Sequence, residues 1–382
     1  MKKTSLFTNG VIWFGAAVSI AEIEAGLQTG ANWSALILGH LFGGLLLFLA
    51  GLLGACSGKN AMETTESTFG SWGMRFFALA NVVQLVGWTA VMLAQGAAAL
   101  GPLVNHPTVY LALPLALLVA VWIFIGLGDK WRLTTVGMVL LAALSAFITI
   151  RLAGLPVDAA AKPHEPLAFW AAFEVSAAMP LSWLPLISDY TKNAERPLGA
   201  SAVSAGVYTV VSVWMYALGA LLNSCGAADF ASGLVRAGQP LAVFGLVVVV
   251  LSTVTTTFLD AYSSGESAKS LCARLDPKLV GVAVCALGAV LAVCGIMDRY
   301  LDFLYLIASV FAPMASVLLV DRYLVKRSAT WWNLFAWLAG TLTYQFAGSS
   351  PIGPTLTAIL VSAVLSILVI LVPRRRRLRI LV

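Results

Sequence analysis

Charged residues are scarce in this 382-residue chain, which has 23 Lys and Arg and 17 Asp and Glu. They make up 10% of the residues, whereas soluble globular domains have about 25%. Hydrophobic residues make up 60%, and the mean hydropathy is +0.92. No soluble fold buries so much apolar side chain, which excludes a water-soluble enzyme, a disordered segment and a secreted scaffold. The sequence therefore predicts an integral membrane protein.

Enzyme and metal motifs are also lacking. The five cysteines are odd in number and form no CxxC pair, which favours their being small buried hydrophobic residues. We find no HExxH, GxSxG or P-loop motif and no plausible Cys/His pair. A membrane hydrolase or an ATP-driven pump thus has no support, and we expect neither catalysis nor a cofactor. The first apolar run leads into Glu22 and Glu24 without a small-residue cleavage site, so no cleavable signal peptide is expected.

Long apolar runs, separated by Gly, Pro and charged clusters, predict twelve membrane spans. The predicted spans cover residues 10–31, 34–56, 73–100, 108–127, 131–153, 167–190, 198–222, 239–264, 279–296, 300–320, 331–347 and 354–372. Backbone groups in lipid must pair internally, and the period-two alternation of barrel strands is absent. The predicted fold class is an all-α membrane protein.

The basic residues predict which side of the membrane each connection faces. With the N-terminus inside, 19 Lys and Arg fall in inside segments and 4 fall outside, namely Arg151, Lys162, Arg236 and Arg299. This bias follows the positive-inside rule and predicts that both termini are cytoplasmic, in a multi-pass protein of the inner membrane. The basic tail at 373–382 is interpreted as an anchor near anionic lipid rather than as a nucleic-acid site.

Four acids lie in the interior of the predicted spans, away from their ends: Glu22, Glu24, Glu174 and Asp260. An ionisable group at membrane depth costs several kcal/mol, so these residues are predicted to mark a functional site. The alternative for each is a protonated carboxyl that is hydrogen-bonded to a neighbouring helix. Glu22 and Glu24 lie about 200° apart on a helical wheel, so an intact helix cannot direct both to one cavity. Either they face different neighbours or the helix is unwound there.

The first and sixth predicted spans each contain a candidate break. Small and polar residues occupy 15–26, and Pro180 and Pro185 interrupt the hydrogen-bond ladder of the sixth span. Interrupted helices five spans apart are typical of inverted-repeat transporters, whose substrate site lies at the breaks. Two independent proline kinks are the alternative.

The third span has a polar face formed by Asn81, Gln84, Trp88 and Gln95. A Trp deep in a span can stack on a flat ring while an amide bonds the edge of that ring. The alternative is that these side chains hold helices together.

The eighth span places Ser252, Thr256 and Asp260 on one face, at i, i+4 and i+8. Their oxygens suit sodium when carbonyls of an unwound helix complete the shell. Threonines alone are weak evidence because they often bond carbonyls of their own helix, and Asp260 strengthens the prediction.

These stretches resemble the nucleobase–cation symporter-1 family, in particular its cytosine and hydroxymethylpyrimidine branch. The resemblance rests on four segments, at 13–22, 84–91, 179–191 and 252–263. It implies a LeuT-like five-plus-five inverted repeat with two C-terminal helices, and alternating access around a midplane site. The first repeat would then cover 1–153, the second 167–320 and the two added helices 331–372, followed by the basic tail.

The resemblance also implies a set of site residues. Substrate contacts are expected from the first, third, sixth and eighth spans, at Glu22, Gln84, Trp88, Glu174, Met179, Ser182, Trp183 and Asp260. A sodium site is expected from first-span carbonyls and eighth-span hydroxyls, at Val18, Ala21, Thr255 and Thr256. Relatives commonly carry Asn where this chain has Thr257 or Asp260, and an amide where it has Glu22, which adds negative charge around the site.

The extra acids suit a 4-aminopyrimidine, whose amino group lies beside a ring nitrogen that can accept a hydrogen bond or a proton. We therefore hypothesise that Glu22 or Glu174 pairs with that edge while Trp88 stacks on the ring. The sequence predicts a secondary-active importer of a small aminopyrimidine, hydroxymethylpyrimidine (a thiamine precursor) ahead of cytosine, coupled to sodium ahead of protons. An amino-acid transporter of the same fold is the alternative, although four acids would repel a carboxylate. An ion channel is the alternative from a different class.

Overall fold

The computed structural model describes residues 3–30, 32–104, 108–125, 131–154, 165–236, 239–326 and 329–371. Within these ranges the chain is helical, and its one β pairing is an isolated bridge between Thr4 and Ala194. The basic tail at 373–382 lies outside the described residues.

The α-helices are bounded as follows: α1 Leu6–Ala17, α2 Ile20–Thr29, α3 Trp33–Ser57, α4 Ala61–Val104, α5 Thr108–Ile125, α6 Trp131–Ala153, α7 Phe169–Ser182, α8 Ile187–Thr191, α9 Pro197–Ser224, α10 Phe230–Arg236, α11 Gln239–Leu271, α12 Pro277–Val293, α13 Tyr300–Leu319, α14 Thr330–Phe346 and α15 Pro354–Leu368. Short 3₁₀ segments follow α12, α14 and α15, and a π-helical segment follows α13.

The first predicted span is broken between α1 and α2, whose axes are bent by 55°. Ser19 caps the new helix, because its Oγ accepts a hydrogen bond from the Glu22 N–H at 3.2 Å. The predicted interruption of this span is therefore confirmed. Glu22 and Glu24 both follow the break on α2, so the alternative in which they face different neighbours is the correct one.

The sixth predicted span is broken as well. Helix α7 ends at Ser182, helix α8 begins at Ile187, and a turn that contains Pro185 joins them. Pro185 cannot donate to the helical ladder and lies in this turn, whereas Pro180, which was also predicted to interrupt the span, lies inside α7.

Two predicted boundaries were wrong, and one helix was missed. The third span, predicted to begin at 73, belongs to α4, which begins at Ala61 and kinks at Gly70, where φ is +74°. Helix α11 continues past the predicted end at 264, and helix α10 was not predicted. The extra turns at the start of α4 and the end of α11 are polar, so hydropathy did not reveal them; long-range contacts bury them instead.

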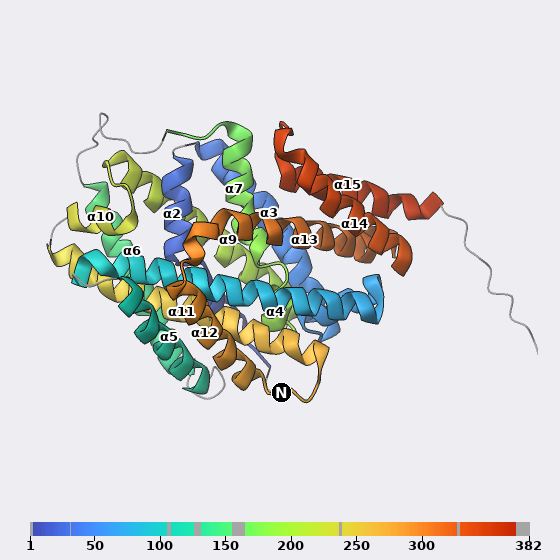
Figure 1. Cartoon of the computed structure of the whole chain (residues 1–382), viewed down its shortest axis with the longest axis horizontal. Helices are drawn as coiled ribbons and strands as arrows, with labels where there is room; N and C mark the ends of the chain where they lie inside the picture. Colours follow the sequence, from blue (N-terminus) through green and yellow to red (C-terminus); the bar gives the residue numbers. More distant parts are fainter. Residues whose placement is uncertain are drawn as a thin grey trace, which may run out of the picture.

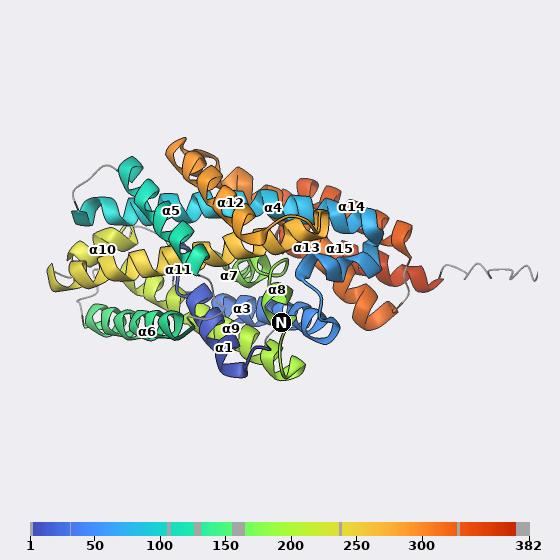
Figure 2. The same ribbon diagram turned by 90° about the horizontal axis from the view of Figure 1, so that it is seen from below.

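Among the described residues, six helices are long and apolar enough to cross a membrane, and α1 with α2 would form a seventh span. Helices α7, α8 and α11 lie between a group formed by α4, α5 and α12 and a second group formed by α1, α3 and α9 (Figure 2). Helices α14 and α15 pack together at one edge of the molecule (Figure 1). Helix α2 contacts α7, and α1 contacts α11, so the two broken spans meet inside the helical assembly.

A group of polar contacts lies on the face of the molecule where the N-terminus lies. The Thr4 N–H donates to the Asn193 carbonyl at 2.9 Å. The Lys192 ammonium is paired with the Glu266 carboxylate, and each side chain is only 8% exposed. The Asp189 carboxylate accepts from the Ala61 N–H at 2.8 Å and thereby caps α4. These contacts join α8, α11 and the start of α4 on this face.

Candidate functional site

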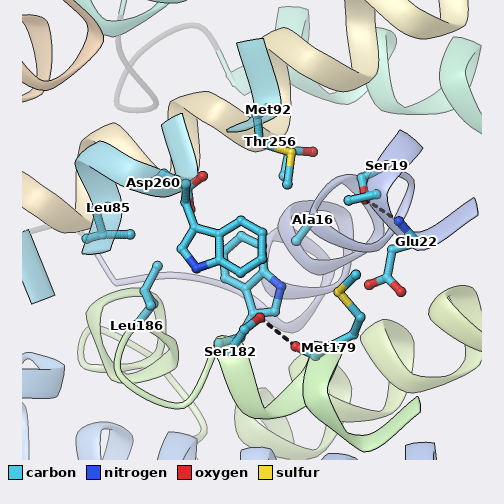
Figure 3. A pocket seen from close by; sticks show the side chains of 13 residues that line it. Ala16, Ser19, Glu22, Leu85, Met92, Met179, Ser182, Leu186, Thr256 and Asp260 are labelled. Carbon is cyan, nitrogen blue, oxygen red and sulfur yellow. Dashed lines mark hydrogen bonds between the residues drawn. The ribbon is translucent and has the colours of Figure 1, made fainter. Parts of the chain in front are cut away.

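A small cavity of about 20 Å³ lies where the two broken spans meet α4 and α11. Its walls, drawn in Figure 3, are formed by Ala16, Ser19, Ala21, Glu22, Leu85, Trp88, Met92, Met179, Ser182, Trp183, Leu186, Thr256 and Asp260. Asp260 and Glu22 lie on opposite sides of it, and Met179 and Ser182 lie along a third side (Figure 3). The cavity is thus lined mainly by apolar and aromatic side chains, with one carboxyl group on each of two opposite sides.

A larger cavity of about 700 Å³ adjoins the small one, and Ala21, Trp88, Met179 and Ser182 line both. Helices α2, α4, α7, α13, α14 and α15 supply its wall. The wall includes Gln28 near the end of α2, Tyr344 near the end of α14 and Thr355 at the start of α15. These helix ends lie away from the N-terminal face, so the large cavity approaches the site from the opposite side.

Most of the predicted substrate residues meet at the small cavity. Six of the eight line it: Glu22, Trp88, Met179, Ser182, Trp183 and Asp260. The other two, Gln84 and Glu174, line the large cavity instead. Side chains that are far apart in the sequence are therefore brought together as the predicted spans required.

Two indole side chains supply the aromatic surface of the small cavity. Trp88, which is 6% exposed, meets the ring of Phe303 edge-on at a centroid distance of 5.7 Å. Trp183 meets Trp13 edge-on at 5.5 Å, and Tyr208 packs against both of these tryptophans. Edge-to-face packing fixes the orientation of each ring.

Glu22 is held within the protein. Its two carboxylate oxygens accept hydrogen bonds from the Tyr208 hydroxyl at 2.5 Å and the Ser212 hydroxyl at 2.7 Å. Ser212 also lies 2.8 Å from the Nε2 atom of the buried His40. Although Glu22 borders the cavity, α9 therefore occupies both of its oxygens.

Glu24 and Glu174 each accept a backbone hydrogen bond from a distant helix. The Phe230 N–H of α10 donates to Glu24, and the Thr355 N–H of α15 donates to Glu174, both at 2.9 Å. Each carboxylate thus lies at the first turn of a helix, where the amide groups and the helix dipole favour negative charge.

Asp260 differs from the other three acids. Its side chain is 4% exposed, and it accepts no hydrogen bond from any described residue. A buried carboxyl without partners costs free energy and is uncommon in a folded protein. Of the four acids, Asp260 thus keeps its hydrogen-bonding capacity for a ligand.

Of the four expected sodium ligands, Val18 lies at the break between α1 and α2, Ala21 lies in the first turn of α2, and Thr255 and Thr256 lie on α11. The Ser252 hydroxyl donates to the Val18 carbonyl at 2.7 Å, and the Thr256 hydroxyl lies 3.4 Å from the Gly15 carbonyl. Ala21 and Thr256 also line the small cavity. Hydroxyls of α11 therefore meet carbonyls of the broken helix, and the bonded pairs are Ser252 with Val18 and Thr256 with Gly15. Of the four expected ligands, only Val18 and Thr256 take part in these contacts, whose oxygens are of the kind that sodium binds.

Thr255 fits that set less closely, because its hydroxyl donates to the Leu251 carbonyl of its own helix at 2.7 Å. The part of the chain that the structure describes holds no group of three or more His, Cys, Asp or Glu side chains placed to bind a metal.

The polar face of α4 serves two purposes. Asn81 donates to the Ser267 hydroxyl at 2.7 Å and to the Pro185 carbonyl at 3.3 Å, so it holds helices together. Gln84 donates to Asn81 at 2.5 Å, and with Trp88 and Gln95 it lines the large cavity.

Several site residues were not predicted. Leu85 and Met92 lie three residues before and four after Trp88, and helical spacing could have found them. Ser19 stands three residues before Glu22, as in a capping box, which is also a local signal. Tyr208 and Ser212 contact the site from α9, and no local pattern marks them.

Residues 3–373 match the family model for permeases of cytosine/purines, uracil, thiamine and allantoin. The chain is 23% identical over 324 residues to the cytosine permease of Escherichia coli (strain K12), covering 83% of this chain and 76% of the permease. Its fold is that of Mhp1, a nucleobase-cation-symport-1 family transporter solved in a closed conformation with bromovinylhydantoin bound. The TM-score is 0.79 at 18% identity, over 96% of this chain and 92% of Mhp1. A Na⁺-coupled sialic acid symporter in an outward-open state also matches, with a TM-score of 0.76 at 15% identity, over 96% of this chain and 90% of the symporter.

Proposed function

The chain belongs to the family of permeases for cytosine/purines, uracil, thiamine and allantoin, and within that family we propose that it is a cation-coupled importer of a small aminopyrimidine. Hydroxymethylpyrimidine is the first candidate substrate and cytosine the second. The observation that carries the proposal is the buried carboxyl of Asp260, which lies without a partner among the described residues beside an aromatic cavity.

The amidine edge of a 4-aminopyrimidine is complementary to this carboxyl. A carboxylate accepts from the amino group and from a protonated ring nitrogen, and a neutral carboxyl accepts from one atom and donates to the other. The ring itself would stack on Trp88, and Met179, Ser182 and Trp183 would enclose it. Asp260 suits this role better than Glu22 or Glu174, whose oxygens already accept hydrogen bonds from α9 and α15.

The volumes of the two cavities support an entry route. A space of about 20 Å³ holds one or two water molecules and is too small for a pyrimidine ring. The substrate would enter through the cavity of about 700 Å³ and displace the Met179 side chain, which borders both spaces. If the N-terminus is cytoplasmic, as the basic residues predict, this cavity faces the outside and the group of polar contacts on the N-terminal face lies on the inside.

Sodium is the proposed coupling ion, bound by the carbonyls of Val18 and Ala21 and the hydroxyls of Thr255 and Thr256. An ion that joins α1, α2 and α11 would stabilise the broken helix in the form that binds substrate, which links the two binding events. We further propose twelve spans, built as two inverted repeats of five with two added helices, in the inner membrane.

Uptake into proteoliposomes tests this function. Cytosine and hydroxymethylpyrimidine are compared with uracil, which lacks the amino group, and with an amino-acid mixture. The expected result is uptake of the aminopyrimidines, driven by an inward sodium gradient and weaker for uracil. Uptake driven by a proton gradient without sodium would overturn the proposal that sodium is the coupling ion. Transport of amino acids alone would overturn the proposal that the substrate is an aminopyrimidine.

A further inference from the structure

Phe303, on α13, contacts the Trp88 indole and does not line either cavity. The two ring centroids are 5.7 Å apart, and the ring planes meet at 76°. Trp88 lines both cavities, whereas Phe303 is not among the described residues that line either one. A ligand in these cavities can therefore be affected by Phe303 only through Trp88 or through movement of the backbone.

The residue next to Trp88 is shaped to receive the Phe303 ring. A Cβ atom added at Gly87 would overlap the Cε2 and Cζ atoms of Phe303. Any side chain other than hydrogen at this position would push the ring away from α4. Gly87 and Trp88 together thus form the seat of the Phe303 ring.

The helix that carries Phe303 also borders the access route. Leu304, Ile307 and Ala308 of α13 line the large cavity. The Phe303 ring thus connects α13, which forms part of the wall of the large cavity, to Trp88, the proposed stacking residue.

We propose that Phe303 is a positioning residue, which holds the Trp88 indole at the angle needed to stack on a planar ring and so favours aromatic over saturated ligands. An indole without this contact can rotate, and ordering it would then oppose binding. The inference rests on the proposed function, because it assumes that Trp88 stacks on the substrate.

The test compares two ligands with the same amidine edge. Cytosine is planar, whereas freshly prepared 5,6-dihydrocytosine has a puckered, partly saturated ring that stacks poorly. Equilibrium binding of each to the purified full-length protein gives a ratio of affinities that reports stacking. Phe303→Leu is expected to weaken cytosine binding about three- to tenfold, the strength of one aromatic pair, and to change dihydrocytosine binding less than twofold.

Gly87→Ala provides a second variant, because it displaces the same ring without altering it. It is expected to lower the cytosine affinity in the wild-type background and to add nothing in the Phe303→Leu background. Phe77→Leu is the control. This fully buried ring lies on α4, as Gly87 and Trp88 do, but it packs on Phe69 and Trp337. It is expected to leave the affinity ratio unchanged.

Equal losses for both ligands in Phe303→Leu, or no loss for either, would overturn the positioning role. Full cytosine affinity in Trp88→Ala, or wild-type protein that binds no pyrimidine, would overturn the proposed function instead. The two failures are therefore distinguishable.

Discussion

Replacing Asp260 with Asn is expected to separate the effect on ligand binding from the effect on stability. The side chain keeps its shape, and the carboxylate is lost. Because Asp260 is 4% exposed and has no partner among the described residues, no hydrogen bond within that part of the chain is broken. Most substitutions of buried polar residues destabilise a protein, whereas this one replaces a buried carboxyl that the ligand-free protein leaves without a partner among the described residues.

The substitution is expected to leave the stability of the ligand-free protein equal or higher and to lower its affinity for an aminopyrimidine. An unsatisfied buried polar group costs about 1–3 kcal/mol, and more when it is charged, so the ligand-free variant is expected to be as stable as wild type or about 1 kcal/mol more stable. A hydrogen bond to a charged group contributes about 1.5–3 kcal/mol, so loss of the carboxylate is expected to weaken aminopyrimidine binding about 10- to 100-fold.

The assay measures thermal unfolding of the purified protein without ligand and equilibrium binding of radiolabelled cytosine to the same preparation. Glu22→Gln is the matched control, because it changes an acid that α9 already binds. A less stable Asp260→Asn variant that still binds cytosine normally would refute the reasoning, since Asp260 would then be a structural residue.

Three further predictions follow from the contacts described above. Glu22→Gln is expected to lower the free energy of unfolding by about 1–2 kcal/mol, because an NH2 donor replaces one of the two oxygens that accept from Tyr208 and Ser212; unchanged thermal unfolding would contradict this. Lys192→Met is expected to cost about 3 kcal/mol by leaving Glu266 buried, with Lys269 at 3.8 Å only partly compensating. The double variant Lys192→Met/Glu266→Gln is expected to recover most of that loss, and an additive loss would argue against a buried pair. Thr256→Val is expected to raise the sodium concentration for half-maximal uptake about tenfold, whereas an unchanged sodium dependence would remove Thr256 from the ion site.

Local sequence was sufficient to predict the breaks in the helices. Pro185 lies in the break that it predicts, and the small and polar residues before Glu22 lie beside theirs, whereas Pro180 remains inside α7. The common face of Ser252, Thr256 and Asp260 also follows from helical spacing alone, and the structure places all three near the break between α1 and α2. These predictions succeeded because the forces that decide them are local.

The features that sequence reasoning missed depend on distant partners. The start of α4 at Ala61 is capped by Asp189, which lies 128 residues later in the chain. Which acid is left for a ligand depends on Tyr208 and Ser212 for Glu22 and on the amide of Thr355 for Glu174. The sequence shows four equivalent acids in apolar spans, and only their tertiary contacts distinguish Asp260.

Calorimetric titration of cytosine and hydroxymethylpyrimidine into the purified protein, in sodium chloride and in choline chloride, tests the central claim most directly. The account predicts saturable binding of at least one of them, tighter in sodium, and its loss in Asp260→Asn and Trp88→Ala. Binding that is unaffected by both substitutions, or no binding of either pyrimidine with sodium present, would contradict it.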